Sequence, residues 1–173
     1  DPDGYEAAVR TGLAAITAGE VEKVVLARDL VGTVPAGADL RRLPRTLSSG
    51  YPDTWTFAVD GHIGSSPETL VQVGNGMATA RVLAGSIARG ADADADAAAA
   101  HRLANSEKDR DEHRYAVQSV VDALAPHARG GVAASETPFT LQLPNLWHLA
   151  TNIEGVLSDA SSALDLAAAP PPT

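Results

Sequence analysis

The feature that most constrains the fold is an Asn-Gly pair between two runs of strand-forming residues. Residues 69–73 and 77–83 are rich in β-branched and apolar side chains, and Asn75-Gly76 lies between them. Asn-Gly is the preferred pair for a two-residue type I′ turn, in which both residues have a positive φ. The sequence therefore predicts an antiparallel hairpin, so at least part of the fold must be antiparallel sheet.

The register of this hairpin brings an acid next to a turn of small residues. With the Asn-Gly pair as the turn, Glu68 lies opposite Leu83, at the end of the hairpin where Gly85 and Ser86 follow. Oriented backbone N–H groups in such a turn can hold an anion. We therefore interpret Glu68 as a candidate acid beside a candidate carboxylate cradle. The alternative is that these residues only shape the strand ends.

The rest of the chain predicts helices and further hairpins without regular βαβ alternation. We expect a helix over 5–20 capped by Gly19, a strand over 21–30, a short helix over 39–48, and a strand over 55–59 before an Asp60-Gly61 turn. We also expect a solvated loop over 91–100 running into one helix that stops before Pro126, and strands over 139–143 and 146–156. Together these predict an α+β fold, with mostly antiparallel sheets and outer helices.

The composition of the chain indicates its cellular compartment and excludes some classes of partner. The chain has 173 residues, enough for one domain, and its net charge of -9 has the wrong sign for binding nucleic acid or an anionic membrane. It has no cysteine, which excludes disulfide frameworks and zinc–thiolate sites. No apolar run approaches the ~20 residues of a membrane span, and the acidic start is unlike a signal peptide. We expect a cytoplasmic protein that needs local cations for any anionic substrate.

Lysine is rare in this chain, which has eleven arginines but only Lys23 and Lys108. In a strand over 21–30, Lys23 shares a face with Val25 and Ala27, because side chains alternate with period two. If that face is buried, desolvation lowers the lysine pKa towards the range of a general base. The alternative is a lysine whose head reaches solvent from a strand end.

The charged run over 106–114 is expected on a helix. Lys108 and Glu112 are four residues apart, as are Asp109 and His113, so each pair can meet on one face. Such a run usually forms a solvated, ion-paired surface. A metal interpretation needs a carboxylate turned inwards, for which Glu112 is the best candidate, and oxygen ligands without cysteine favour magnesium or manganese.

Five segments in order, from Glu22 to Leu157, resemble the chorismate-utilising enzymes, and most closely the isochorismate synthases. The segments are EKVVLAR, IGSSPETLV, VLAGSIARG, LANSEKDRDEHRYAV and LPNLWHLATNIEGVL. The resemblance implies an incomplete chorismate-binding fold of the anthranilate synthase component I type. It also implies that residues 1–173 are a partial domain, lacking the family's N-terminal portion and C-terminal strands.

The resemblance also implies a role for each matching residue. Lys23 matches the base that activates water to attack C2 of chorismate, and Glu68 matches the acid that protonates the departing C4 hydroxyl. Gly85 and Ser86 match the turn that holds a substrate carboxylate, Glu112 matches a Mg²⁺ ligand, and His148 and Thr151 match the strand that lines the ring pocket. By their residue types alone, strand histidines such as His148 are more often core residues.

Two alternatives stay open. The first is a salicylate synthase or another chorismate-utilising enzyme: salicylate synthases share the lysine and the glutamate and add pyruvate elimination, whereas in anthranilate synthases the residue that corresponds to Lys23 resembles a glutamine. The second, a degenerate, non-catalytic fragment that binds a ligand or a partner, belongs to a different class.

We expect the partial chain to be inactive alone. Whether its product feeds siderophore, menaquinone or salicylate formation, and its oligomeric state, stay open; a small molecule, rather than nucleic acid or a membrane, is the expected partner.

Overall fold

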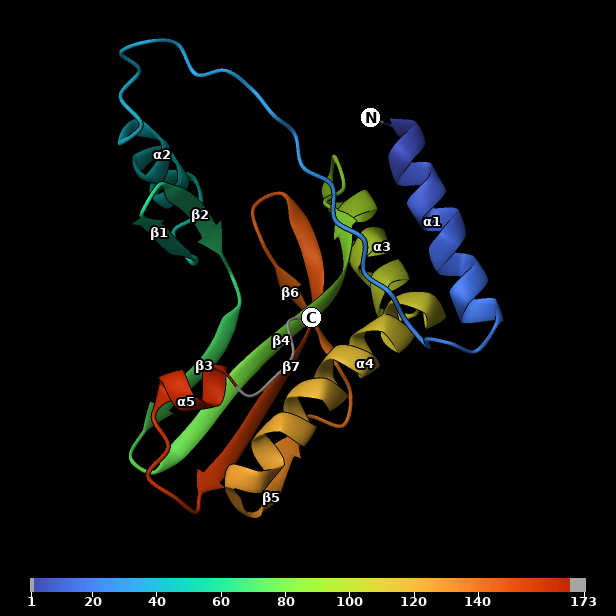
Figure 1. Cartoon of the computed structure of the whole chain (residues 1–173), viewed down its shortest axis with the longest axis vertical. Helices are drawn as coiled ribbons and strands as arrows, with labels where there is room; N and C mark the ends of the chain where they lie inside the picture. The colour runs from blue at the N-terminus through green and yellow to red at the C-terminus, as the bar shows by residue number, and fades with distance from the viewer. Residues whose placement is uncertain (1, 169–173) are drawn as a thin grey trace. The chain divides into compact units, whose positions relative to one another are not determined.

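The computed structural model describes residues 2–168, and the chain divides into two compact units, residues 1–39 and 40–173. Figure 1 shows the course of the chain and labels its helices and strands. No helix within residues 2–168 has both the length and the apolar character needed to cross a membrane.

The first unit contains one helix, α1 (Pro2–Thr17). Gly19 has a φ of 72° and donates its N–H to the Ile16 carbonyl at 3.0 Å, while the Glu20 N–H reaches the Ala15 carbonyl at 3.0 Å. This pair of bonds is a Schellman motif, which favours glycine at the left-handed position. The predicted cap at Gly19 is confirmed.

Residues 21–30 form no regular structure, so the predicted strand is wrong. Val25 is 63% exposed and Leu30 is 86% exposed. No strand within residues 2–168 pairs with this segment. β-Branched residues form a strand only where a neighbouring strand completes the hydrogen bonds and buries a face. The alternation that put Lys23 on a face with Val25 therefore does not apply.

The second unit begins with a helix beside a hairpin. Helix α2 (Arg42–Gly50) contacts β1 (Trp55–Val59) and β2 (His62–Ser66), which form a two-stranded antiparallel sheet. Asp60 and Gly61 connect the strands with φ values of 46° and 82°. The predicted short helix, strand and Asp-Gly turn are confirmed.

Five strands form the main sheet, and every pairing in it is antiparallel. Its order is β3-β4-β7-β5, with β6 also paired to β7, and the bounds are β3 (Thr69–Gly74), β4 (Met77–Ala88), β5 (Ala128–Ala134), β6 (Phe139–Gln142) and β7 (Leu146–Leu157). Asn75 and Gly76 have φ values of 51° and 74°, as the type I′ turn requires. The hairpin predicted from Asn75-Gly76 is confirmed.

The segment from 91 to 124 is two helices, α3 (Ala93–Ala104) and α4 (Glu107–Leu124), followed by a 3-10 turn, η1 (Ala125–His127). The Asp92 side chain accepts from the Ala95 N–H and begins α3, so most of the predicted loop is helical. The Ser106 side chain accepts from the Asp109 N–H and begins α4. The single predicted helix is wrong because a serine N-cap starts a new helix there.

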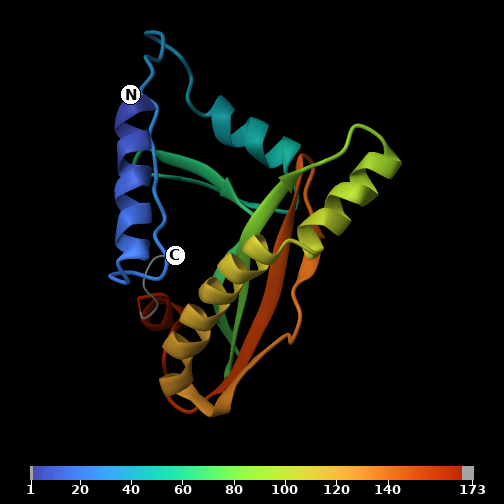
Figure 2. The ribbon, with the colours of Figure 1, turned by 90° about the vertical axis from the view of Figure 1, so that its right-hand side faces the viewer.

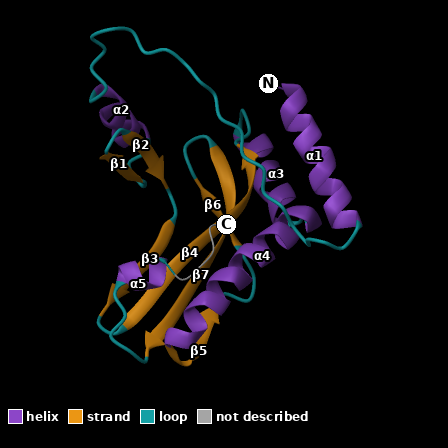
Figure 3. Ribbon diagram, viewed as in Figure 1, coloured by secondary structure: helices purple, strands orange, loops and turns teal. Residues whose placement is uncertain are grey.

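Helix α4 lies across one face of the main sheet (Figure 2) and contacts β4, β7 and β5. The core between them consists of small and branched residues on both sides: Ala78, Ala80, Val82 and Ile153 from the sheet, Ala116, Val120 and Leu124 from α4, and Leu166 from α5 (Ala163–Ala167). Figure 3 distinguishes these strands and helices by colour. Helices packed on antiparallel sheets confirm the predicted α+β class.

Candidate active site

A bulge in β4 is the centre of the candidate site. Pairing between β4 and β7 joins Leu83 to Ala150 and then Ser86 to His148. Two residues of β4 therefore stand against one residue of β7 at this point. Such bulges bend a strand and change the direction of its side chains, and they are common beside active sites.

Gly85 is required inside this bulge by its conformation and its surroundings. Its φ is 80°, in the left-handed region that favours glycine. A Cβ atom at Gly85 would lie 3.1 Å from the Cβ of Asp109 and 3.4 Å from a methyl group of Leu149. The first turn of α4 thus packs directly on the bulge, and a larger residue would push it away.

Glu68, the residue directly before β3, reaches the same bulge. The pairing of β3 with β4 shifts between Thr69 and Gln72, so the simple register predicted from the turn does not continue to Glu68. Its carboxylate nevertheless accepts a hydrogen bond from the Leu83 N–H at 3.3 Å. The side chain is half-buried. The structure therefore brings Glu68 next to the turn, as the hairpin argument expected.

Ser86 and His148 face each other across β4 and β7. The Ser86 hydroxyl and the His148 Nδ1 are 2.7 Å apart. Ser86 is exposed and His148 is half-buried, so both can meet a molecule from solvent. Glu68, Gly85, Ser86 and His148 thus form one group around the bulge.

Thr151 is buried, whereas a residue that lines an open substrate site would be exposed to solvent. It is 2% exposed, and its hydroxyl lies 2.8 Å from Nε2 of His113, which is also 2% exposed. The other ring nitrogen of His113, Nδ1, lies 3.1 Å from the Ala84 carbonyl oxygen. Burial lowers the pKa of His113, and the bond to Ala84 opposes that shift in part. The ring is therefore neutral near pH 7.

His113 is the residue that sequence reasoning missed. The spacing of four residues predicts that it meets Asp109, but its ring bonds to Ala84 and Thr151 instead. It begins the buried row His113, Ala116, Val120 and Leu124 of α4. That spacing of three, four and four residues is the signal that could have found it. A histidine that begins an otherwise apolar helix face must find hydrogen-bond partners inside the protein.

Glu112 lies on the flank of α4. Its side chain is 40% exposed and its carboxylate lies 3.5 Å from the Lys108 Nζ, so the predicted pair at a spacing of four is confirmed. Within residues 2–168, no three histidine, aspartate or glutamate side chains are grouped so as to hold a metal ion. Glu112 is therefore one available carboxylate rather than part of a complete metal centre.

Lys23 belongs to the first unit, in the segment without regular structure, where it is half-buried. The second unit, which contains the group around the bulge, is therefore built without it. The structure brings together four of the seven predicted site residues at the bulge, and connects Thr151 to it through His113 and Ala84.

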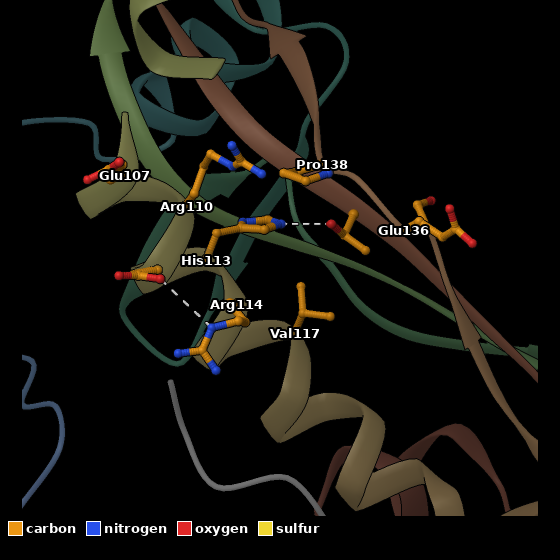
Figure 4. A pocket seen from close by; sticks show the side chains of 10 residues that line it. Glu107, Arg110, His113, Arg114, Val117, Glu136 and Pro138 are labelled. Atoms are coloured by element: carbon orange, nitrogen blue, oxygen red, sulfur yellow. Dashed lines mark hydrogen bonds and ion pairs between the residues drawn. The ribbon is translucent and has the colours of Figure 1, made fainter. Parts of the chain in front are cut away.

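A cavity of about 390 Å³ lies along the flank of α4 that carries Arg110 and Arg114, which does not include Glu112 (Figure 4). It is lined by both signs of charge, with Arg110 and Arg114 from α4 and Glu136 from the segment after β5. His113 and Thr151 also line it, and the dashed line from the labelled His113 in Figure 4 marks their bond. Among the predicted site residues, Thr151 alone borders this cavity.

The group at the bulge has the parts needed to bind and protonate an anionic substrate. Backbone N–H groups at a bulge can hold a carboxylate, a serine hydroxyl and an imidazole can add hydrogen bonds, and a glutamic acid can give a proton to a leaving group. An acid and an anion cradle on adjoining strands fit a reaction in which a carboxylate-bearing molecule loses a hydroxyl.

Comparisons with known proteins identify the family of the chain. A family model described as chorismate binding enzyme matches residues 1–173. The isochorismate synthase DhbC of Bacillus subtilis (strain 168) is 36% identical over 185 residues, covering 100% of this chain and 46% of that protein. The isochorismate synthase EntC of Escherichia coli (strain K12) is 34% identical, covering 98% of this chain and 44% of that protein.

The fold has a match among solved structures as well. A crystal structure from Bacillus anthracis, named for a 2,3-dihydroxybenzoate-specific isochorismate synthase, DhbC, has a TM-score of 0.80 and 28% identity. The match covers 98% of this chain and 48% of that chain. This chain thus spans about half the length of the relatives that it matches. It belongs to the chorismate-binding enzyme family, with relatives that are isochorismate synthases.

Proposed function

We propose that this chain is part of an isochorismate synthase, an isomerase that converts chorismate to isochorismate. The observation that carries the proposal is the β4 bulge, where the Glu68 carboxylate accepts from the Leu83 N–H beside Gly85 and Ser86. An acid held next to a carboxylate cradle is what the loss of the C4 hydroxyl from a dicarboxylate requires.

The reaction moves a hydroxyl group from C4 to C2 of the ring. Water attacks C2 and loses a proton to the base, the ring double bonds shift, and the C4 hydroxyl leaves with a proton from the acid. One water enters and one leaves, so the change is an isomerisation. We propose Lys23 for the base and Glu68 for the acid; each role would contribute about 10²–10⁴-fold in rate.

Binding of the substrate is proposed at the bulge. The N–H groups of Gly85 and Ser86 would hold one carboxylate, and His148 and Thr151 would line the ring pocket. The Ser86–His148 contact of 2.7 Å supports this assignment, because it gives the Ser86 hydroxyl a fixed position next to the turn. Thr151 would lie behind the exposed wall of that pocket, since its hydroxyl is buried and bonded to His113.

Magnesium is proposed as the cation that offsets the charge of the substrate, with Glu112 as a ligand. Mg²⁺ is commonly bound by one or two carboxylates together with water and substrate oxygens, so a single half-exposed glutamate fits part of such a site. When bound, the ion would neutralise carboxylate charge in a chain of net charge -9. A cytoplasmic location is proposed with it.

The experiment joins this chain to the remaining half of a relative and assays isochorismate formation with and without Mg²⁺. We expect magnesium-dependent turnover by the fusion and none by the 173-residue chain alone. Lys23→Ala and Glu68→Gln should each lower kcat about 10²–10⁴-fold. Glu154→Gln, an exposed glutamate of β7, is the matched control and should keep full activity.

Two results would contradict the proposal. An active fusion that keeps its rate with Lys23→Ala or Glu68→Gln would remove the assigned base or acid. Release of pyruvate and salicylate in place of isochorismate would identify a salicylate synthase, because that reaction adds an elimination step.

A further inference from the structure

His113 is a buried titratable group that the proposed reaction does not use. It is 2% exposed and comes from the second turn of α4, yet both of its ring nitrogens bond to the sheet. A buried imidazole costs free energy unless its nitrogens are paired. The positions of its two partners therefore indicate what the residue does.

The partners of His113 come from the two strands that form the bulge. One is the carbonyl oxygen of Ala84, the residue directly before Gly85. The other is the hydroxyl of Thr151 on β7, which pairs with Val82 of β4. A single ring therefore connects α4, β4 and β7 immediately behind the turn.

The hydrogen bonds also determine which nitrogen carries the proton. A carbonyl oxygen only accepts, so Nδ1 of His113 donates to Ala84. In the neutral ring Nε2 is then an acceptor, and the Thr151 hydroxyl donates to it. One tautomer satisfies both partners, and the ring has a single orientation.

The distance from α4 to the turn matters because both carry proposed site residues. Gly85 already meets Asp109 of α4 closely enough that a Cβ atom would be 3.1 Å away. Glu112, the proposed Mg²⁺ ligand, is the residue before His113 in the chain. A shift of the bulge against the helix would therefore separate the carboxylate cradle from Glu112.

We propose that His113 is a positioning residue that holds the Gly85–Ser86 turn at a defined distance from α4, so that the turn can bind a carboxylate of the substrate. The inference rests on the proposed function. His113 touches no reacting atom in it and acts through the Ala84 carbonyl and the Thr151 hydroxyl.

The test uses the 173-residue chain and three substitutions. His113→Asn keeps a side-chain N–H close to the place of Nδ1 and can still donate to Ala84. His113→Phe keeps a ring but loses both hydrogen bonds, and Thr151→Val keeps the side-chain shape but loses the hydroxyl. Val120→Ala, a buried residue two turns further along α4, is the control for lost stability without a change at the bulge.

Two measurements are made on each variant: the Kd for chorismate with Mg²⁺ by calorimetry, and the NMR signals of the Gly85 and Ser86 amides. His113→Phe should raise Kd about tenfold and move both amide signals, because the Ala84 bond is lost. His113→Asn should stay within about threefold of the unsubstituted chain, and Thr151→Val should lie between them. Val120→Ala should lower Tm and leave Kd and both amides unchanged.

Failure of the inference differs from failure of the proposed function. If His113→Phe leaves the two amides and Kd unchanged, or if Val120→Ala weakens binding as much as His113→Phe, His113 does not position the turn. If the unsubstituted chain binds no chorismate, the proposed binding at the bulge of this chain fails, and the assay of the fusion decides the proposed function. The amide signals and their rescue by His113→Asn then still decide whether His113 holds the turn.

Discussion

Residues 77–83 and residues 21–30 are both predicted to form strands, and only residues 77–83 do, as part of β4, which continues through a bulge to Ala88. β4 pairs with β3 on one side and β7 on the other, and its inward residues Ala78, Ala80 and Val82 are buried. Residues 21–30 pair with no strand of the described chain, and Val25 is 63% exposed. Similar β-branched composition thus gives different structures.

The difference shows what a strand needs beyond its own residues. The partner of β4 in the hairpin is only a two-residue turn away, so the local Asn-Gly signal contains the pairing information. Residues 21–30 have no such neighbour in the sequence, and any strand that would pair with them must come from elsewhere.

The largest difference in unfolding free energy between the main sheet and the segment over 21–30 is expected when an apolar side chain is truncated in each. Ile153 on β7 is 1% exposed, so Ile153→Ala should lower the free energy of unfolding by about 2–5 kcal/mol, through lost burial and a cavity. The control Val25→Ala, in the exposed segment, should change it by less than about 0.5 kcal/mol. Urea denaturation measures both, and equal effects would break the comparison.

A methyl group on the bulge glycine is the second test. Gly85→Ala must place a Cβ at a φ of 80° and 3.1 Å from Asp109, so we expect a loss of about 1–3 kcal/mol in unfolding free energy. Gly32→Ala, where nothing lies within 4 Å of an added Cβ, is the control and should be neutral or slightly stabilising. A harmless Gly85→Ala in urea denaturation would mean that the bulge is not closely packed.

The end of β4 gives a pH-dependent test. The hydrogen bond from Arg89, followed by those from Trp147 and the Gly90 N–H, holds the pKa of Asp96 well below its ordinary 3.8. A carboxyl with a lowered folded pKa contributes stability that is complete above 3.8 and is lost as the pH falls below it. Asp96→Asn should therefore destabilise the chain at pH 6, and the difference should shrink below about pH 4.

Asp29→Asn is the matched control for this experiment. Asp29 lies in the exposed segment over 21–30, and its substitution should change the midpoint of thermal unfolding little at either pH. A pH-independent difference between Asp96→Asn and the unsubstituted chain would contradict the ionised Arg89–Asp96 pair.

The smallest effect is expected at the surface of α4. Lys108 is 83% exposed in its side chain and 3.5 Å from Glu112. Such pairs contribute about 0–1 kcal/mol, so Lys108→Ala should lower the unfolding free energy by less than about 0.5 kcal/mol. Urea denaturation at low and high salt measures this difference, which salt should reduce further. A larger loss would mean that Lys108 stabilises α4 by more than its pair with Glu112.

The fold could be predicted where the signals are local. Asn75-Gly76, Asp60-Gly61 and the Gly19 cap all have the expected positive φ values. β5 (Ala128–Ala134) was missed, because Gly130-Gly131 in its middle resembles a flexible link; there the pairing with β7 shifts register. α5 was missed as well, although Ser162 and Asp165 form a capping box at its start.

The site could be predicted as far as the hairpin extends. The turn brings Glu68 to Leu83 even though the register of β3 shifts by one residue, because the carboxylate is long enough to reach the N–H. The contact between His113 and Thr151 joins residues 38 apart in sequence, and no local pattern contains it. The two side chains bond to each other because both are buried and need hydrogen-bond partners, and they become buried only when α4 packs on the sheet.

Binding of a chorismate carboxylate at the β4 bulge can be tested by an NMR titration of the 173-residue chain with chorismate and Mg²⁺. The titration follows the backbone amides of the bulge and those beside the cavity. We expect saturable shifts centred on Gly85 and Ser86, with His148 affected. Unchanged signals at Gly85 and Ser86, or shifts centred on Ser135 and Glu136 beside the cavity, would contradict it.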